Sequence, residues 1–265
     1  MSLDGTNWHP LGIEFVVYAP LTVHSLEPAA LSATGGATLR LAASNLFASP
    51  DLCVKFVKGA TSLTLPAAFD EASASAVVSA PAWAPATALL AAYEKAKAAA
   101  EAASSAEGAA PVEPPPPPAL TDAEEDAIVE LSVNGQQWTT DCKHVRFVLD
   151  PVIQALEPST APIEGQCPLK LTGLYFVETG CLKVRFTKLA PYEEGTTPAL
   201  PPDATYLEVD VTCNDGAISV VAPAFEGVAD SFAAAVQLSA DGQTFGPTFV
   251  VLKYEAVAAK GGKKK

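Results

Sequence analysis

An internal repeat with a spacing of 130 residues is the feature that most restricts how this chain can fold. Leu26-Glu27-Pro28 recurs as Leu156-Glu157-Pro158, and Val54-Lys55-Phe56 recurs in kind as Val184-Arg185-Phe186. Both pairs of segments keep the same order and the same offset, so they are independent anchors of one repeat. A chain of 265 residues has room for two domains. The repeat predicts that both domains have the same fold.

A short motif closes each copy and also occurs at the start of the chain. Leu131–Trp138 reads LSVNGQQW, Leu238–Phe245 reads LSADGQTF, and Met1–Trp8 reads MSLDGTNW. Asn-Gly or Asp-Gly between alternating apolar and polar residues is a strong signal for a tight β-hairpin. Residues 1–20 are therefore expected to be the C-terminal hairpin of a preceding domain in a larger protein. The alternative is that this hairpin packs on the domain that follows, because two strands alone are only marginally stable.

Each copy has the pattern of seven short alternating strands, with no βαβ rhythm. This pattern predicts an all-β fold of two Greek-key sandwiches, with another small β-barrel as the alternative. The domains are expected at 21–150 and 151–258. In the first, strands are expected near 21–26, 37–43, 52–57, 61–65, 74–79, 128–133 and 144–149. In the second, strands are expected near 152–156, 167–173, 182–187, 205–211, 217–221, 232–238 and 247–254.

An insert at 84–127 distinguishes the first copy. Its Ala-rich first part predicts a helix over 86–107, and Pro111-Val-Glu-Pro114 continuing to Pro118 predicts polyproline II over 111–118. The insert is either a surface spacer or a docking arm that projects from the sandwich. Polyproline is ordered before it binds and fits grooves lined by aromatic side chains. The candidate partner-binding residues are Pro114, Pro115, Pro116, Pro117 and Pro118.

The formal net charge is -14, and four lysines lie in the last six residues. Such an acidic body repels phosphate backbones, which argues against nucleic-acid binding by the folded part. The basic tail at 259–265 is either a solubilising terminus or an electrostatic tether to a polyanion. Its candidate partner-binding residues are Lys263, Lys264 and Lys265.

Four pieces of the sequence resemble the IPT/TIG family of immunoglobulin-like domains. They are EPSTAPIEG at 157–165, LTGLYF at 171–176, APAF at 222–225 and SADGQTF at 239–245. The first copy departs from the family pattern, because it lacks a counterpart of Gly173 and carries the large insert. The resemblance implies tandem immunoglobulin-like sandwiches with a binding or spacer role and no shared catalytic residues.

A search for chemistry finds no catalytic, cofactor or metal motif. The three histidines are far apart in sequence, without paired spacing, and no phosphate-binding glycine loop or nucleophile elbow occurs. Trp8, Trp138 and Phe245 share one position at the end of the repeated motif. We expect these rings to cover one end of each core, and a sugar-stacking platform is the alternative.

We therefore expect a non-catalytic protein without cofactors, in contact with other structural proteins of a multi-protein complex. The resemblance suggests the axoneme of a cilium or flagellum, in the cytoplasmic cytoskeleton and associated with microtubules. The five unpaired cysteines and the absence of N-glycosylation sequons fit that setting. An extracellular recognition module, or an accessory domain of a glycan-processing enzyme, is the alternative. A Rel-like dimerisation module is a third reading.

Overall fold

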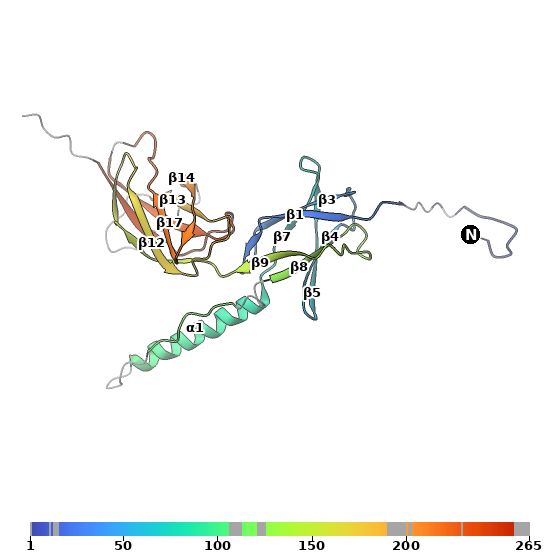
Figure 1. The fold of residues 1–265 in the computed structure, drawn as a ribbon, viewed down its shortest axis with the longest axis horizontal. Coiled ribbons are helices and arrows are strands. Elements are labelled where there is room, and N and C mark those ends of the chain that lie inside the picture. The colour runs from blue at the N-terminus through green and yellow to red at the C-terminus, as the bar shows by residue number, and fades with distance from the viewer. Residues whose placement is uncertain are drawn as a thin grey trace, which may run out of the picture.

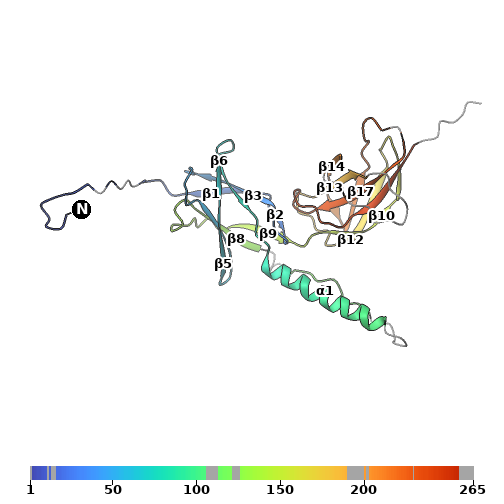
Figure 2. The same cartoon turned by 180° about the vertical axis from the view of Figure 1, so that it is seen from behind.

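The computed structural model describes residues 2–10, 12, 16–105, 113–120, 126–189, 200, 203–228 and 230–256. Two β-sandwiches follow one another along the long axis of the molecule, and one helix projects from the region of their junction (Figures 1 and 2). The all-β tandem of immunoglobulin-like sandwiches expected from the repeat is confirmed. None of the described helices is long and apolar enough to cross a membrane.

The first sandwich contains two sheets. A four-stranded sheet has the order β1-β3-β7-β6, and a five-stranded sheet has the order β2-β9-β8-β4-β5. Neighbours are antiparallel except β2 and β9, which run parallel. The strands are β1 Thr22–Glu27, β2 Ala30–Ser32, β3 Thr38–Ser44, β4 Cys53–Lys58, β5 Thr61–Pro66, β6 Ala68–Asp70, β7 Ser75–Ser79, β8 Asp126–Ser132 and β9 Lys143–Val148.

The second sandwich repeats this topology strand for strand. Its sheets have the orders β10-β12-β16-β15 and β11-β18-β17-β13-β14, and β11 and β18 are the parallel pair. The strands are β10 Val152–Glu157, β11 Thr160–Pro162, β12 Pro168–Leu174, β13 Lys183–Lys188, β14 Tyr206–Asp210, β15 Cys213–Asn214, β16 Ala217–Val221, β17 Phe232–Ser239 and β18 Val250–Glu255.

All fourteen expected strands are present, with their ends shifted by three residues at most. The expected number of seven per sandwich was wrong, because each sandwich has nine. The missed strands β2, β6, β11 and β15 are two or three residues long. Alternation of apolar and polar residues cannot be recognised over so short a segment.

A pair of aromatic side chains lies in each core at equivalent positions. Trp83 stacks on Phe147 in the first sandwich, with ring centroids 4.3 Å apart. In the second sandwich Phe225 meets Tyr254 edge to face at 5.7 Å. The Tyr254 hydroxyl donates to the Pro223 carbonyl at 3.0 Å, and burial raises the pKa of this phenol. The two cores thus share an arrangement but differ in the rings that fill it.

The repeated Asn-Gly or Asp-Gly motif does not form the tight hairpin that we expected. A type I′ turn needs positive φ at both central residues. Gly135 has a φ of 68°, whereas Asn134 is not among the described residues with positive φ. The Asn134 side-chain oxygen instead accepts the backbone N–H groups of Gln136 and Gln137, at 3.0 and 2.9 Å. The motif therefore encodes an Asx turn within a longer loop.

The same turn recurs in the other two copies of the motif. The Asp241 carboxylate accepts the N–H groups of Gln243 and Thr244 at 2.9 and 2.7 Å, and Asp4 accepts the equivalent pair at 2.9 and 2.8 Å. These bonds, with a serine hydroxyl, hold the pKa of Asp4 well below its usual range. The local motif thus forms its turn even where no sheet surrounds it.

The expected strands around the Asp4 turn are not formed in the described part of the chain. No strand precedes Thr22 among residues 2–10, 12 and 16–21. Trp8 is 75 % exposed. A strand pair without a further sheet to bury one face has little to stabilise it. The assignment of this segment to a preceding domain stays a prediction.

Candidate functional site at the junction of the two sandwiches

A three-residue linker, residues 149–151, joins the sandwiches, and the chain at its start packs into both cores. Val148, at the end of β9, is buried in the second core, whereas the following Leu149 is buried in the first. Asp150 turns back to the first sandwich, where its carboxylate accepts the hydroxyls of Ser32 and Thr34 at 2.5 and 2.8 Å. The junction is therefore held by packing in both cores and by hydrogen bonds to the first sandwich.

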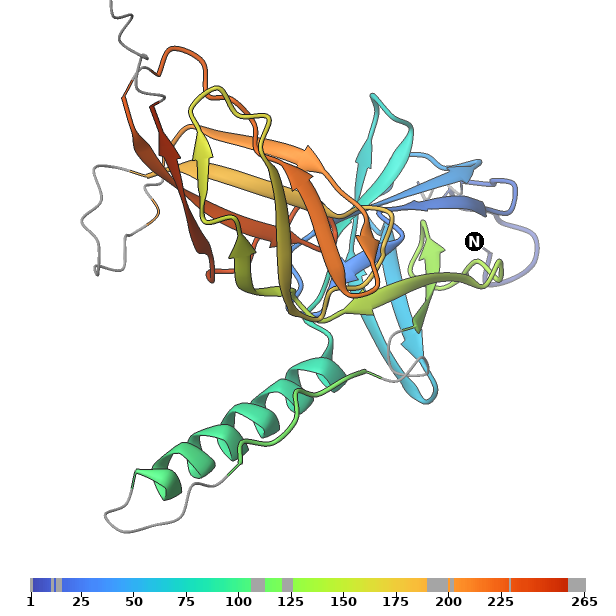
Figure 3. The same cartoon turned by 60° about the vertical axis from the view of Figure 1, so that its left-hand side comes forward.

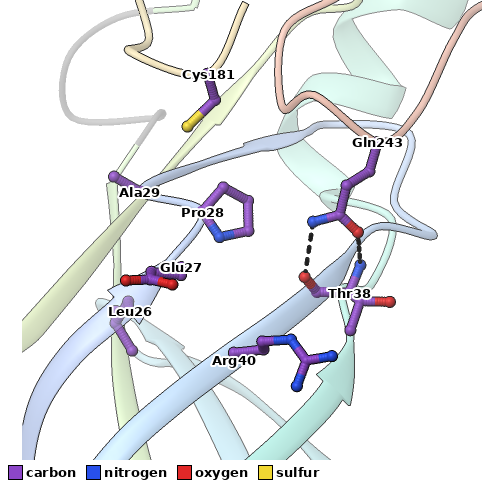
Figure 4. A pocket seen from close by; sticks show the side chains of 8 residues that line it. All are labelled: Leu26, Glu27, Pro28, Ala29, Thr38, Arg40, Cys181 and Gln243. Atoms are coloured by element: carbon purple, nitrogen blue, oxygen red, sulfur yellow. Dashed lines mark hydrogen bonds between the residues drawn. The ribbon is translucent and has the colours of Figure 1, made fainter. Parts of the chain in front are cut away.

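A turn of the second sandwich binds directly to the first. We name Asp241–Thr244 the docking turn, and the backbone groups of Ser32 and Thr38 the edge site. The Ser32 N–H donates to Asp241 Oδ2 at 3.1 Å. The Gln243 side chain makes a paired contact, since Thr38 N–H donates to its Oε1 and its Nε2 donates to the Thr38 carbonyl, both at 2.9 Å. Figure 4 shows this amide pair.

The edge site exists because two strands leave backbone groups unpaired. β2 is the outer strand of its sheet, with β9 as its one neighbour. Thr38 begins β3 beyond the end of β1, whose last residue, Glu27, pairs with Arg40. Unpaired groups at a sheet edge bind whatever presents matching donors and acceptors. The docking turn extends the hydrogen-bonding pattern of both edges.

An open cavity of about 650 Å³ lies beside this contact. Figure 4 shows Cys181 and Arg40 on opposite sides of it, so the Arg40 guanidinium does not lie beside the thiol. Arg40 is held instead by Asp70, at 2.7 Å. We interpret the cavity as space left between the joined sandwiches. Its lining is Leu26, Glu27, Pro28, Ala29, Thr38, Arg40, Cys181 and Gln243.

The rings that follow the turns pack against basic side chains, which corrects the expectation that they cover a core. Lys55 Nζ lies 4.3 Å from the Trp138 ring centroid, and the Arg185 guanidinium lies 3.7 Å from that of Phe245. Lys55 and Arg185 are equivalent residues of β4 and β13. They face away from the core because Val54 and Phe56 beside Lys55 are the buried ones. A ring covered by a cation has less free face for a sugar.

The insert forms a helix that begins two residues earlier than expected. α1 spans Ala84–Ser104, and Pro85 stands in its first turn, where no N–H is needed. Its more buried stripe runs from Ala86 through Tyr93 to Ala100. The proline segment returns alongside the helix (Figure 3). Pro114 shares a cavity of about 380 Å³ with the C-terminal end of α1. We name α1 and 113–120 together the arm.

The predicted partner-binding prolines lie on this arm. Pro115 and Pro118 are half-buried, and Pro114, Pro116 and Pro117 are exposed. A three-residue period is that of polyproline II, so Pro115 and Pro118 lie on one edge of the segment. The predicted binding residues Lys263, Lys264 and Lys265 lie outside the described residues.

A tyrosine of the second sandwich lies near the arm. Tyr175 packs against the first core, and burial, with Tyr93 and Glu94 nearby, raises the pKa of its phenol. Its φ is 61°, as is that of its counterpart Asn45. Asparagine tolerates this left-handed conformation, whereas tyrosine rarely adopts it. Tyr175 thus takes its place beside the first core and the arm in a backbone conformation that costs a tyrosine free energy.

Sequence reasoning missed the docking turn and the basic residues on the rings. The matching of Lys55 with Arg185, and of Trp138 with Phe245, was available from the repeat. Their contact was not, because it joins strand β4 or β13 to a loop distant in sequence. Three or more His, Cys, Asp or Glu residues do not gather into a possible metal site anywhere in the described ranges.

Comparisons with known proteins give structural neighbours and no sequence relative. No protein-family model matches the chain, and no curated protein matches it. Two solved structures of the plexin A4 extracellular region are similar. One is 15 % identical with a TM-score of 0.43 over 80 % of this chain, and the other is 14 % identical with 0.38 over 96 %. A tetra-tandem repeat from the extending region of a large adhesion protein gives 9 % identity and 0.29 over 89 %.

The chain spans 13 % and 20 % of the two plexin chains and 48 % of the adhesion-protein chain.

Proposed function

We propose that this chain is a non-catalytic structural module that holds two sandwiches in a fixed relation and presents the arm to a protein partner. The observation that carries the proposal is the direct contact between the docking turn and the edge site, reinforced by the short linker. A joint of this kind transmits orientation from one sandwich to the next, as a spacer in a larger assembly requires. The arm, which projects from the joint, is the element most accessible to a partner (Figure 3).

The setting has two candidates, a ciliary or flagellar axoneme and an extracellular recognition surface. The similar solved structures named above come from the extracellular region of plexin A4 and from a large adhesion protein. No comparison bears on the axoneme. Titration of the thiols in protein from its natural source separates the two settings. Five reduced cysteines support the cytoplasmic setting, and disulfides support the extracellular one.

The arm is tested by substitutions on its two sides. P116A/P117A changes exposed prolines, and P115A/P118A changes the half-buried ones. The first variant is expected to lose co-sedimentation with the native assembly while its helical circular dichroism stays unchanged. The second is expected to loosen the arm itself. Normal co-sedimentation of P116A/P117A would show that the exposed prolines bind no partner.

Complete removal of the arm needs boundaries that the structure now supplies. Deletion of 86–127 would remove Ala86 and Ala127, both of which are buried in the first core. Replacement of residues 88–124 by a glycine–serine linker keeps these two side chains. This variant is expected to remain folded and to leave the assembly. If it assembles as the wild type does, the arm is a spacer.

A further inference from the structure

We propose that the turn at 134–137 of the first sandwich is a second docking turn, which binds the edge site of another sandwich of this fold. It is the repeat equivalent of the docking turn, with Gln136 in the place of Gln243. The proposal goes beyond the proposed function, because the arm and this turn are on different parts of the molecule and can fail separately.

The two turns have the same internal geometry. Ser132 donates to Asn134 at 3.1 Å, as Ser239 donates to Asp241 at 3.0 Å. In each, the side-chain oxygen at the first position also accepts two backbone N–H groups. The turn at 134–137 therefore presents Gln136 in the way that the docking turn presents Gln243.

The turns differ in what covers them. Asp241 is 2 % exposed beneath the first sandwich. Gln136 is exposed, and its side-chain amide has no partner among the described residues. The neighbouring Gln137 accepts a hydrogen bond from the Tyr18 hydroxyl at 3.2 Å. A preorganised turn with a free amide is suited to bind, because little conformational entropy remains to be lost.

A second copy of this chain does not supply the edge site. The edge site of its first sandwich is already filled by its own docking turn. In its second sandwich, Pro162 and Pro168 occupy the positions of Ser32 and Thr38. Proline has no N–H, so both donors of the edge site are missing there. Proline at an edge is a common means of blocking unwanted strand pairing.

The chemistry of the partner follows from the residues of the turn. Gln136 needs a backbone N–H and C=O pair, so the partner has a residue other than proline at the Thr38 position. Asn134 has an amide nitrogen where Asp241 has the oxygen that accepts the Ser32 N–H. The partner must therefore offer a hydrogen-bond acceptor there. We therefore expect the turn at 134–137 to bind another sandwich of the same repeat, which has no proline at the Thr38 position and a hydrogen-bond acceptor at the Ser32 position.

The full chain provides the test, because its blocked edge can be opened. P162S/P168T restores both donors in the second sandwich, and N134D restores the acceptor in the first. Molecules with all three changes are expected to associate head to tail into open chains, because the two surfaces are different. Sedimentation equilibrium should show that the average mass at least doubles by a protein concentration of about 1 mM. This is the effective concentration that a short linker typically gives two surfaces within one molecule. The wild type should keep its mass.

Addition of Gln136→Ala to the triple variant is the matched control and should abolish the association. The proposal is overturned if the triple variant, folded by circular dichroism, keeps the wild-type mass. It is equally overturned if Gln136→Ala leaves the association intact, since another surface would then be responsible.

Should the triple variant not fold, the single variant Pro168→Thr provides the test. Pro168 is exposed, and the change restores the N–H opposite Gln136. It should produce a smaller rise in mass, and no rise would reject the proposal.

Discussion

The two sandwiches have one topology and different surfaces. Strand order, the parallel outer pair and the central aromatic contact are common to both. The first sandwich adds the arm between β7 and β8, and its edge site binds the docking turn. The second has prolines at that edge and places Tyr175 where the first has Asn45. The differences are concentrated at the surfaces through which the sandwiches meet each other or a partner. A repeat can therefore keep its core while each copy acquires its own contacts.

Removal of the aromatic ring of Trp83 or Phe225 is expected to have the largest effect on the stability of the two sandwiches. Trp83→Ala and Phe225→Ala each leave a cavity in one core, and each should cost about 3–5 kcal/mol of unfolding free energy. Trp83 also directly precedes α1. The helical circular dichroism signal of Trp83→Ala should therefore be lost at a lower denaturant concentration than that of the wild type, whereas the helical signal of Phe225→Ala should not change. Equal loss of helical signal in both variants would mean that the arm does not depend on the first core.

Substitution of the two turn residues should show which turn is engaged. Asp241→Ala leaves the buried Ser32 N–H and the turn N–H groups without an acceptor, and should cost about 3 kcal/mol. Asn134→Ala at the half-exposed turn should cost about 1 kcal/mol. With one dye on each sandwich, the distribution of energy-transfer efficiencies should be broader for Asp241→Ala than for the wild type. An unchanged distribution would show that the linker alone sets the orientation.

A glycine difference between the copies has a steric cause. A Cβ at Gly173 would lie 2.0 Å from the Val152 carbonyl oxygen, so β10 must shift. Gly173→Ala should destabilise the second sandwich by about 1–3 kcal/mol. The first copy has Ala43 at this position, and Ala43→Gly should cost about 0.5–1 kcal/mol through backbone entropy. Chemical denaturation of both variants checks this, and equal costs would contradict the steric explanation.

The smallest expected difference between the two sandwiches is the loss of unfolding free energy at acid pH. Backbone N–H groups of Cys213 and Gly180 lower the pKa of Glu178 below the ordinary 4.5. The pKa of Glu178 is lower in the folded than in the unfolded chain. The Glu178 carboxylate therefore stabilises the fold above pH 4.5, and this contribution is lost as pH falls through the folded pKa. The first copy has Ala48 there. Glu178→Gln should reduce the difference in unfolding free energy between pH 6 and pH 3 only slightly. No reduction would mean that the carboxylate is not stabilised.

The sequence of this chain determined its architecture through local patterns. Alternating strands such as Val54-Lys55-Phe56 specify which side chains are buried, and repetition of that pattern specifies two equal domains. The Asx turns also follow from local sequence, since Asp4 forms one without a surrounding sheet. The helix of the insert was predicted within a few residues because its alanines favour helix wherever the chain goes.

The tertiary structure alone decided how the parts meet. Gln243 binds Thr38 across 205 residues of sequence, and nothing local to either residue indicates the pairing. The same holds for Arg185 on Phe245 and for Tyr175 beside the arm. Such contacts depend on the path that brings two edges together, whereas periodicity reports only whether a side chain is buried or exposed. The repeated turn thus has one sequence pattern and two environments, covered in the second sandwich and open in the first.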